Sequence, residues 1–195
     1  MSNTAAIHQL MSKPVFNASE ARRLGIYPSL LQFYIKKNLF ERIGRGVYRS
    51  LSASLDVDFK WEDLVLTAKG VNKGIVCLIS ALSIYELTDE IAREFWIAIP
   101  HSTTAPIREG TKFIRMRDCT TGVTHKKIGK ETIVIFDIER TIVDAFRYLS
   151  KEIAIKALKQ SLKTTEGNKV NIQKLQQYAK KFRINLDPYI LTVIT

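Results

Sequence analysis

The chain has 195 residues, 46% of them hydrophobic and 25% charged, which is the balance of an ordinary folded protein. Its net charge of +11 and isoelectric point near 9.7 are unusual. Two separated cysteines and three scattered histidines lack the spacing of a metal site, so we expect no metal and no cofactor. Residues 1–13 lack the pattern of a signal peptide, and the most apolar segment, 75–87, is too short to cross a bilayer. We therefore expect a cytoplasmic, reduced protein that does not enter the membrane.

The positive charge is concentrated at the amino-terminal end. Residues 1–50 hold eight Lys and Arg against two Glu, a balance of +6, whereas the other 145 residues hold a balance of +5. Evenly spread lysines would be explained by solubility alone. A local excess of cations instead favours a polyanionic partner, and double-stranded DNA is the one we expect.

Capping residues divide the first 38 residues into helices. Asn17 and Glu20 stand three residues apart, as in a capping box, and Gly25 ends the helix that they begin. Pro28 suits the first position of the next helix, and Asn38 is a typical left-handed cap. The helices expected here cover residues 4–12, 18–24 and 28–37.

The period then changes from helical to alternating. Residues 39–43 and 47–50 are expected to form a hairpin joined by Gly44-Arg45-Gly46, whose glycines permit positive φ. Helices followed by a hairpin within fifty residues are typical of a winged helix-turn-helix. We predict an α+β protein with such a DNA-binding domain at residues 1–52.

The third helix has the pattern of a recognition helix. Leu31, Tyr34 and Ile35 share the face that would pack on the other helices. On the opposite face, Gln32 can bond adenine through two hydrogen bonds, and Phe33 can contact a thymine methyl. Taken alone, this face would be better explained as an ordinary solvated helix face.

The hairpin favours the interpretation of DNA binding, because a purely structural turn has no need of three arginines. Arg45 lies at the tip, flanked by Arg42 and Arg49, and an arginine there can enter the minor groove. Tyr48 can plug the core or contact a phosphate, and we favour the plug. The DNA contacts predicted are Tyr27, Pro28, Ser29, Gln32, Phe33, Lys36, Lys37, Arg42, Arg45 and Arg49.

Residues 53–195 are expected to form a mixed α/β domain. Their patterns alternate between helical and strand periods, and the tail 188–194 fits either a helix or a strand. The helices expected cover residues 59–68, 80–87, 139–149, 151–162 and 172–182, and the strands cover 75–78, 94–99, 112–116, 123–128 and 132–136.

Catalysis by this second domain is weighed and rejected. Among Asp137, Glu139 and Asp144, two carboxylates could hold Mg²⁺. However, Arg140 and Asp144 are one helical turn apart, which more simply predicts a weak ion pair on a helix surface. The glycines at 70 and 74 lack P-loop spacing. We therefore predict that the protein is not an enzyme.

A second basic face is expected in the strand region. Arg115 and Arg117 alternate onto one side of a strand. Such a face could extend the grip on DNA, meet an acidic partner or simply be solvated. Its members are Arg115, Arg117, Lys126 and Lys127.

Several motifs resemble those of one family. Residues 16–21 (FNASEA), 25–29 (GIYPS) and 42–48 (RIGRGVY) closely resemble the winged-helix domain of AbiEi-type antitoxins, and weaker similarity continues through 61–64, 79–89 and 139–145. One departure is Ile138, which stands where the family pattern has a proline; Asp137 can cap the helix instead.

The resemblance implies a bacterial antitoxin of an AbiE toxin–antitoxin or abortive-infection system that represses its own operon by binding operator repeats. The genetic partner that the resemblance implies is a nucleotidyltransferase-like toxin, which the antitoxin opposes without necessarily forming a stable complex with it. We expect a monomer or weak dimer that is cooperative on DNA. Two alternatives stay open: an interaction module that neutralises a toxin directly, with DNA binding secondary, and an unrecognised enzyme acting on nucleic acid.

Overall fold

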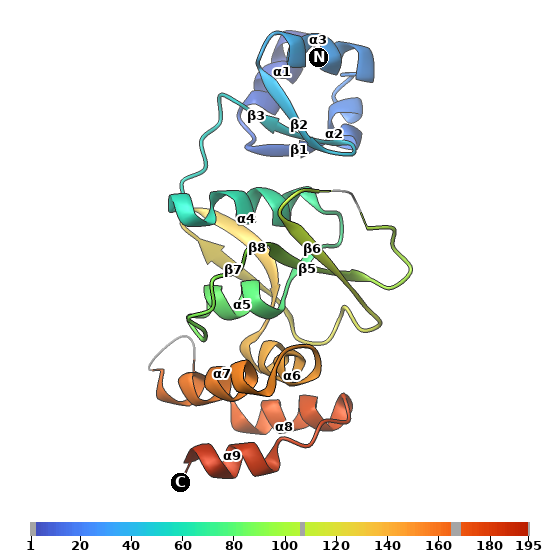
Figure 1. The fold of residues 1–195 in the computed structure, drawn as a ribbon. Coiled ribbons are helices and arrows are strands. Elements are labelled where there is room, and N and C mark those ends of the chain that lie inside the picture. Colours follow the sequence, from blue (N-terminus) through green and yellow to red (C-terminus); the bar gives the residue numbers. More distant parts are fainter. Residues whose placement is uncertain (1–2, 106–107, 165–168, 195) are drawn as a thin grey trace. The chain divides into compact units, whose positions relative to one another are not determined.

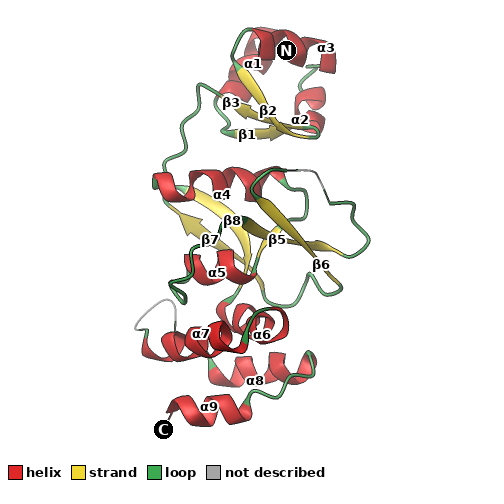
Figure 2. Cartoon of the chain, in the orientation of Figure 1, coloured by secondary structure: helices red, strands yellow, loops and turns green. Residues whose placement is uncertain are grey.

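A computed structural model describes residues 3–105, 108–164 and 169–194 (Figure 1). Helices and strands are mixed as far as residue 136, and the elements described after it are helices (Figure 2). The elements group into two compact units, which are described separately. The first unit contains the described residues of Met1–Gly74, Thr104–Glu109 and Lys127–Ile133, and the second contains those of Ile75–Thr103, Gly110–Lys126 and Val134–Thr195.

The first unit begins with the predicted helices and hairpin, to which the structure adds a strand. β1 pairs antiparallel with β3, so that the sheet order is β1-β3-β2. A strand of three residues is too short to show alternation in the sequence, which explains why we did not predict it. The elements are α1 (Asn3–Met11), β1 (Val15–Asn17), α2 (Ala18–Arg23), α3 (Pro28–Lys36), β2 (Phe40–Gly44) and β3 (Val47–Ser50), followed by α4 (Phe59–Gly70).

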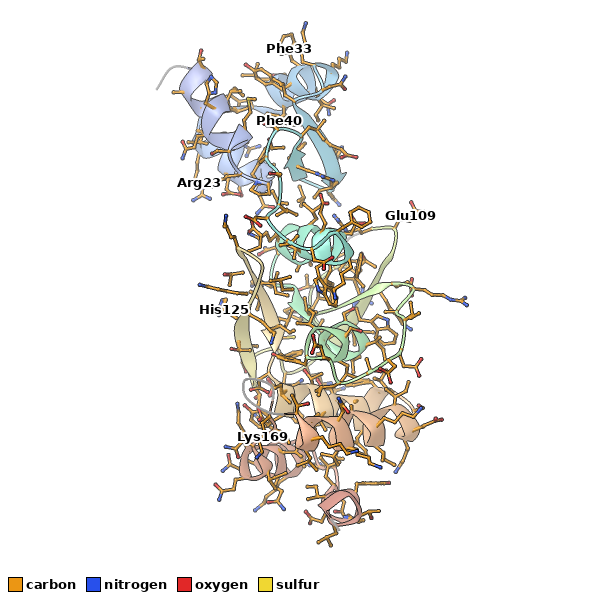
Figure 3. All side chains as sticks on the ribbon, turned by 90° about the vertical axis from the view of Figure 1, so that its left-hand side faces the viewer. Arg23, Phe33, Phe40, Glu109, His125 and Lys169 are labelled. Carbon is orange, nitrogen blue, oxygen red and sulfur yellow. The ribbon has the colours of Figure 1, made fainter. Side chains whose placement is uncertain are left out.

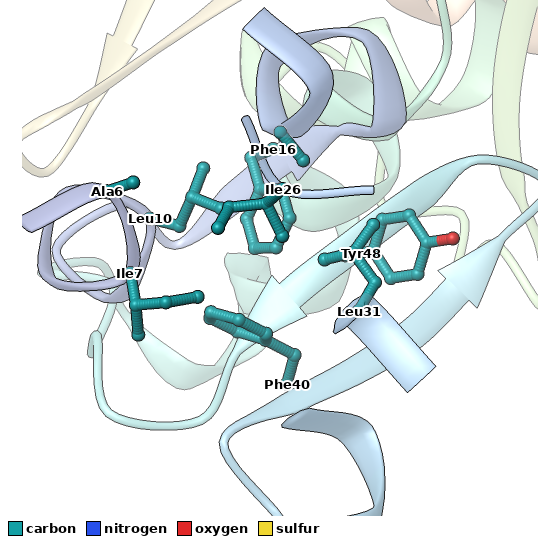
Figure 4. Close-up of a cluster of buried hydrophobic side chains, with 9 residues drawn as sticks. Ala6, Ile7, Leu10, Phe16, Ile26, Leu31, Phe40 and Tyr48 are labelled. Atoms are coloured by element: carbon teal, nitrogen blue, oxygen red, sulfur yellow. The ribbon is translucent and has the colours of Figure 1, made fainter. Parts of the chain in front are cut away.

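An aromatic core joins the three helices to this sheet (Figure 4). The ring of Phe16 meets that of Phe40 edge-on at 4.9 Å and stacks on that of Tyr48 at 5.6 Å. Tyr48 is buried, so its predicted role as a core plug is confirmed. The other buried members are Ala6, Ile7, Leu10, Ala21, Ile26 and Leu31.

The predicted caps set the ends of α2 and α3. The Asn17 backbone N–H donates to the Glu20 carboxylate at 2.9 Å, as in a capping box. Burial alone would raise the pKa of Glu20, but its hydrogen bonds with Lys13 and Asn17 lower that pKa overall. Gly25 and Asn38 both have positive φ, at 82° and 55°, which confirms them as the residues that stop these helices.

The second unit carries most of a five-stranded sheet with the order β6-β5-β4-β8-β7. β4 pairs antiparallel with β5 and parallel with β8, and β5 pairs parallel with β6. The strands are β4 (Ile75–Val76), β5 (Phe95–Pro100), β6 (Thr111–Met116), β7 (Val123–Ile128) and β8 (Glu131–Phe136).

The helices of this unit follow the prediction closely. α5 starts two residues earlier than expected and shortens β4, and of the two options left open for the tail, the structure has the helix. In the described part of the chain, no helix has the length and apolar character needed to cross a membrane. The helices are α5 (Leu78–Ile84), α6 (Ile138–Tyr148), α7 (Lys151–Lys163), α8 (Ile172–Lys181) and α9 (Asp187–Ile194).

Arg140 is the largest fully buried side chain among the described residues, and 1% of it is exposed. Its Nε donates to Asp144 Oδ2 at 2.7 Å, and its Nη atoms donate to the carbonyls of Asp118 and Thr121, both at 3.0 Å. Asp144 is equally buried and also accepts from Arg147 at 2.6 Å. The expected weak surface pair is therefore wrong, because α6 is buried along Ile138–Ala145, including its charged positions.

Asp137 caps α6, as expected where the family pattern has a proline. Its carboxylate accepts from the Arg140 backbone N–H at 2.8 Å. Thr141 satisfies the backbone through its hydroxyl, which donates to the Phe136 carbonyl at 3.3 Å. Both side chains are thus occupied in building the start of the helix.

Replacing Arg140 should destabilise the protein strongly. In Arg140→Met the apolar part of the side chain is kept, but a buried carboxylate and two carbonyls lose their donor, so we expect a loss of about 3–5 kcal/mol. Urea unfolding measures it. The control is Arg115→Met, an exposed arginine on β6, for which we expect a change within about 0.5 kcal/mol. Equal stability of the two variants would contradict the role assigned to Arg140.

The two glycines of the β2–β3 turn should respond differently to substitution. Gly46 has φ +72°, whereas Gly44 lies outside the left-handed region and an added Cβ would meet only an ordinary contact at 3.8 Å. Gly46→Ala should therefore cost about 1–2 kcal/mol of unfolding free energy, and Gly44→Ala should cost clearly less. Thermal or urea unfolding of the matched pair tests this, and an equal or reversed effect would contradict it.

Candidate nucleic-acid interface

The exposed face of α3 carries the residues that the sequence predicted for it. Leu31 is buried, and Tyr34 and Ile35 pack against the aromatic core, so the inner face of the helix is as predicted. The predicted contact residues on the outer side are all exposed: Tyr27, Pro28, Ser29, Gln32, Phe33, Lys36 and Lys37.

Two aromatic rings stand out on this face. Tyr27 is 59% exposed and Phe33 is 51% exposed. Figure 3 labels Phe33 on the outer side of the unit and Phe40 in its interior. The Lys37 ammonium lies 5.8 Å from the centre of the Phe33 ring. The helix therefore presents apolar rings beside amide, hydroxyl and ammonium groups, a combination that suits a surface with both apolar and anionic parts.

The tip of the hairpin is cationic and open to solvent. Arg42 and Arg45 are exposed, and Arg42 Nε donates to the Gly44 carbonyl at 3.2 Å. Residues 42–45 line a hollow of about 420 Å³. The Ala18 backbone N–H donates to the Gly46 carbonyl at 2.8 Å, which ties the tip to the start of α2.

The base of the hairpin is held by contacts from outside residues 1–52. Arg49 Nη2 pairs with Glu62 of α4 at 2.8 Å. Arg108 donates to the Ile43 carbonyl at 3.0 Å and to the Thr67 hydroxyl of α4 at 2.9 Å. Arg49 thus differs from Arg42 and Arg45, since its charge already has a carboxylate partner.

Ion pairing leaves most of the amino-terminal charge free. Of the eight cations in residues 1–50, Lys13 pairs with Glu20 and Arg49 with Glu62. Arg22 and Arg23 are exposed, and the charge count on the sequence could have added them to the predicted contacts. The cations without an ion pair to any described residue are Arg22, Arg23, Lys36, Lys37, Arg42 and Arg45.

The second basic face is not one surface. Arg115 lies on β6 and Arg117 directly follows it, whereas Lys126 and Lys127 lie on β7, and these strands form opposite edges of the sheet. The Lys126 ammonium lies 4.7 Å from the centre of the Tyr85 ring, and burial lowers its pKa. The structure therefore does not bring the four residues together.

The carboxylates considered for Mg²⁺ are held by cations. Asp137 and Glu139 pair with Lys174 at 3.0 and 3.2 Å, and Asp144 pairs with two arginines. In the residues that the structure describes, no group of three or more His, Cys, Asp or Glu is placed to hold a metal ion. These side chains have structural roles in the second unit.

A family comparison matches the segment that carries this interface. Residues 6–50 match the family described as transcriptional regulator, AbiEi antitoxin. No curated protein matches the chain. The matched segment spans most of α1 and all of β1, α2, α3, β2 and β3, which together carry the exposed face of α3 and the arginine hairpin. Residues 6–50 are thus similar to the AbiEi antitoxin transcriptional regulators, as the motifs in this segment predicted.

Proposed function

We propose that residues 1–52 form a winged helix-turn-helix that binds duplex DNA in a sequence-specific way, and that the protein regulates transcription. The observation that carries this proposal is the pairing of an exposed polar helix face with a cationic hairpin on one small aromatic core. The order helix, strand, helix, helix and hairpin, with a sheet order β1-β3-β2, supports it.

In this proposal α3 is the recognition helix. Its amino-terminal half, with Ser29, Gln32 and Phe33, enters the major groove, where the base pairs display distinct donors and acceptors. Lys36 and Lys37 lie further along the helix and contact phosphates, which fix the position of the protein on the duplex. Tyr27 and Pro28 stand at the start of the helix, beside the same groove.

The hairpin is the wing, and Arg45 is its minor-groove residue. An exposed arginine at a tight turn can enter the narrow minor groove, where the negative potential is deepest. Arg42 and Arg49 flank it on the two strands. Because Arg49 pairs with Glu62, it would contribute less to DNA binding than Arg42 does.

The match to the AbiEi family also suggests a biological role for the protein. We infer a bacterial antitoxin that acts in the cytoplasm and represses its own toxin–antitoxin operon through operator repeats, with a nucleotidyltransferase-like toxin as its genetic partner. A single small module buries little DNA surface, so cooperative binding of monomers or weak dimers to repeats is expected. Residues 53–195 would then serve interaction rather than catalysis.

An electrophoretic shift of the protein's own promoter tests the wing. Arg45→Ala should weaken binding to promoter and random duplex alike and reduce the slope of log K against log salt by roughly 0.9, because one cation fewer neutralises the phosphates that line the minor groove. The control is Arg93→Ala, which removes the same charge at an exposed site of the second unit and should leave both quantities unchanged. If the two variants behave alike, the wing does not touch DNA.

A second measurement separates base reading from phosphate contact on α3. Gln32→Ala should cost roughly 1–3 kcal/mol on the promoter and nothing on random duplex, because only a base contact carries sequence information. Lys36→Ala on the same helix should weaken both complexes equally. Equal losses for Gln32→Ala would mean that Gln32 reads no base. Absence of any specific promoter binding, together with a stable complex with a neighbouring gene product, would overturn the proposal in favour of direct toxin neutralisation.

A further inference from the structure

A basic pocket of about 390 Å³ lies within the second unit, and its lining includes none of the residues assigned to DNA binding above. It is formed by the residue after β5, by the end of β6 and the residues after it, by the first and last turns of α6, and by the residue after α8. Its volume falls in the range of small-molecule sites, about 300–1,000 Å³. The side chains used in the argument below include Arg115, Arg117, Arg147, Tyr148 and Phe182.

The charge of the pocket is not balanced from within. Arg115 and Arg117 are exposed, and neither forms an ion pair or side-chain hydrogen bond with any described residue. Asp118 is the acidic residue among the lining side chains. Its carboxylate is occupied by the backbone N–H groups of Thr120 and Thr121 and by Lys181. The pocket therefore collects cations whose repulsion an anion would relieve.

One arginine of the pocket is held in place before any ligand arrives. Arg147 donates to the buried carboxylate of Asp144 at 2.6 Å, and its guanidinium lies 4.9 Å from the ring centre of Tyr148 and 4.6 Å from that of Phe182. A guanidinium fixed by a carboxylate and two rings loses little entropy when it binds an anion. Such preorganisation distinguishes the pocket from a patch of mobile lysines.

The wall behind the pocket is rigid as well. Arg140 hydrogen-bonds the carbonyls of Asp118 and Thr121 and so fixes the segment after β6 against α6. The cation-bearing segment and the helix carrying Arg147 are thus held together by a fully buried side chain.

The aromatic side chains of the pocket favour a ligand that carries a ring as well as a negative charge. Tyr148 is 43% exposed at the pocket, and exposed rings beside arginines are the surfaces on which nucleobases stack. Guanidinium groups also match phosphate oxygens in two-pronged hydrogen bonds. We propose that this pocket binds a nucleotide, with its phosphate on Arg115, Arg117 and Arg147 and its base against Tyr148.

Calorimetric titration of the full chain with AMP tests the proposal, with adenosine and inorganic phosphate as half-ligands. AMP should bind at least tenfold more tightly than either half-ligand, because both parts of the pocket contribute. Binding no tighter than that of phosphate would overturn the nucleotide assignment. A 5′-phosphorylated hexanucleotide distinguishes the two sources of the same chemistry: tighter binding of the oligonucleotide assigns the pocket to a strand end, and tighter binding of AMP assigns it to the free nucleotide.

Three variants distinguish binding of AMP in the pocket from nonspecific attraction of AMP to a basic protein. Arg117→Ala should weaken AMP binding about tenfold or more, as expected for a lost charge-assisted hydrogen bond. Tyr148→Ala should weaken AMP binding more than phosphate binding, because it removes the contact with the base as well as one of the two rings that hold Arg147. Lys127→Ala removes an exposed cation at the opposite edge of the sheet and should have no effect. Equal losses for Arg117→Ala and Lys127→Ala would overturn the proposal.

The inference does not depend on the proposed DNA binding. Arg117→Ala is expected to leave the promoter shift unchanged, and Gln32→Ala is expected to leave AMP binding unchanged. If Arg117→Ala instead weakens promoter binding and not AMP binding, the pocket is part of a DNA contact and the nucleotide assignment is wrong.

Discussion

The second unit depends on one buried ion pair. Burying Arg140 and Asp144 removes two charges from water, which is unfavourable unless every polar atom finds a partner. Here the guanidinium bonds a carboxylate and two carbonyls, and it lies 4.5 Å from the ring centre of Phe136 and 4.1 Å from that of Phe182. The pair therefore joins α6, the loop after β6 and the end of α8, and it orients Arg147 through their shared Asp144. The packing of α6, the position of the loop after β6 and the orientation of Arg147 in the basic pocket all depend on this ion pair.

The first unit relies on a different principle. Its core consists of aromatic and aliphatic side chains, with Phe16 and Tyr48 brought together by the pairing of β1 with β3. Because this core takes the inner face of α3, the outer face is left to polar, cationic and aromatic groups. Ion pairs with Glu20 and Glu62 then neutralise Lys13 and Arg49, and the other cations of this segment form no ion pair with a described residue and are available to a partner.

Local chemistry could be predicted from the sequence, and long-range arrangement could not. The ends of α2 and α3 follow from Gly25 and Asn38, whose left-handed conformations are local properties of those residues. β1 escaped prediction because its evidence is its pairing with β3, about thirty residues away. The buried position of Arg140 was missed because charged residues are ordinarily outside. The separation of Arg115 from Lys127 depends on sheet order, which periodicity does not encode.

The anchoring of the hairpin by α4 limits how the protein can be divided. Glu62 and Thr67 belong to α4, and Arg108 comes from a still later segment, yet together they hold strands β2 and β3 through Arg49 and Ile43. A fragment that stops at residue 52 would retain the aromatic core but release these strands. The hairpin of such a fragment would sample more conformations, and its ordering on a ligand would carry an entropy cost that the intact chain has already met during folding.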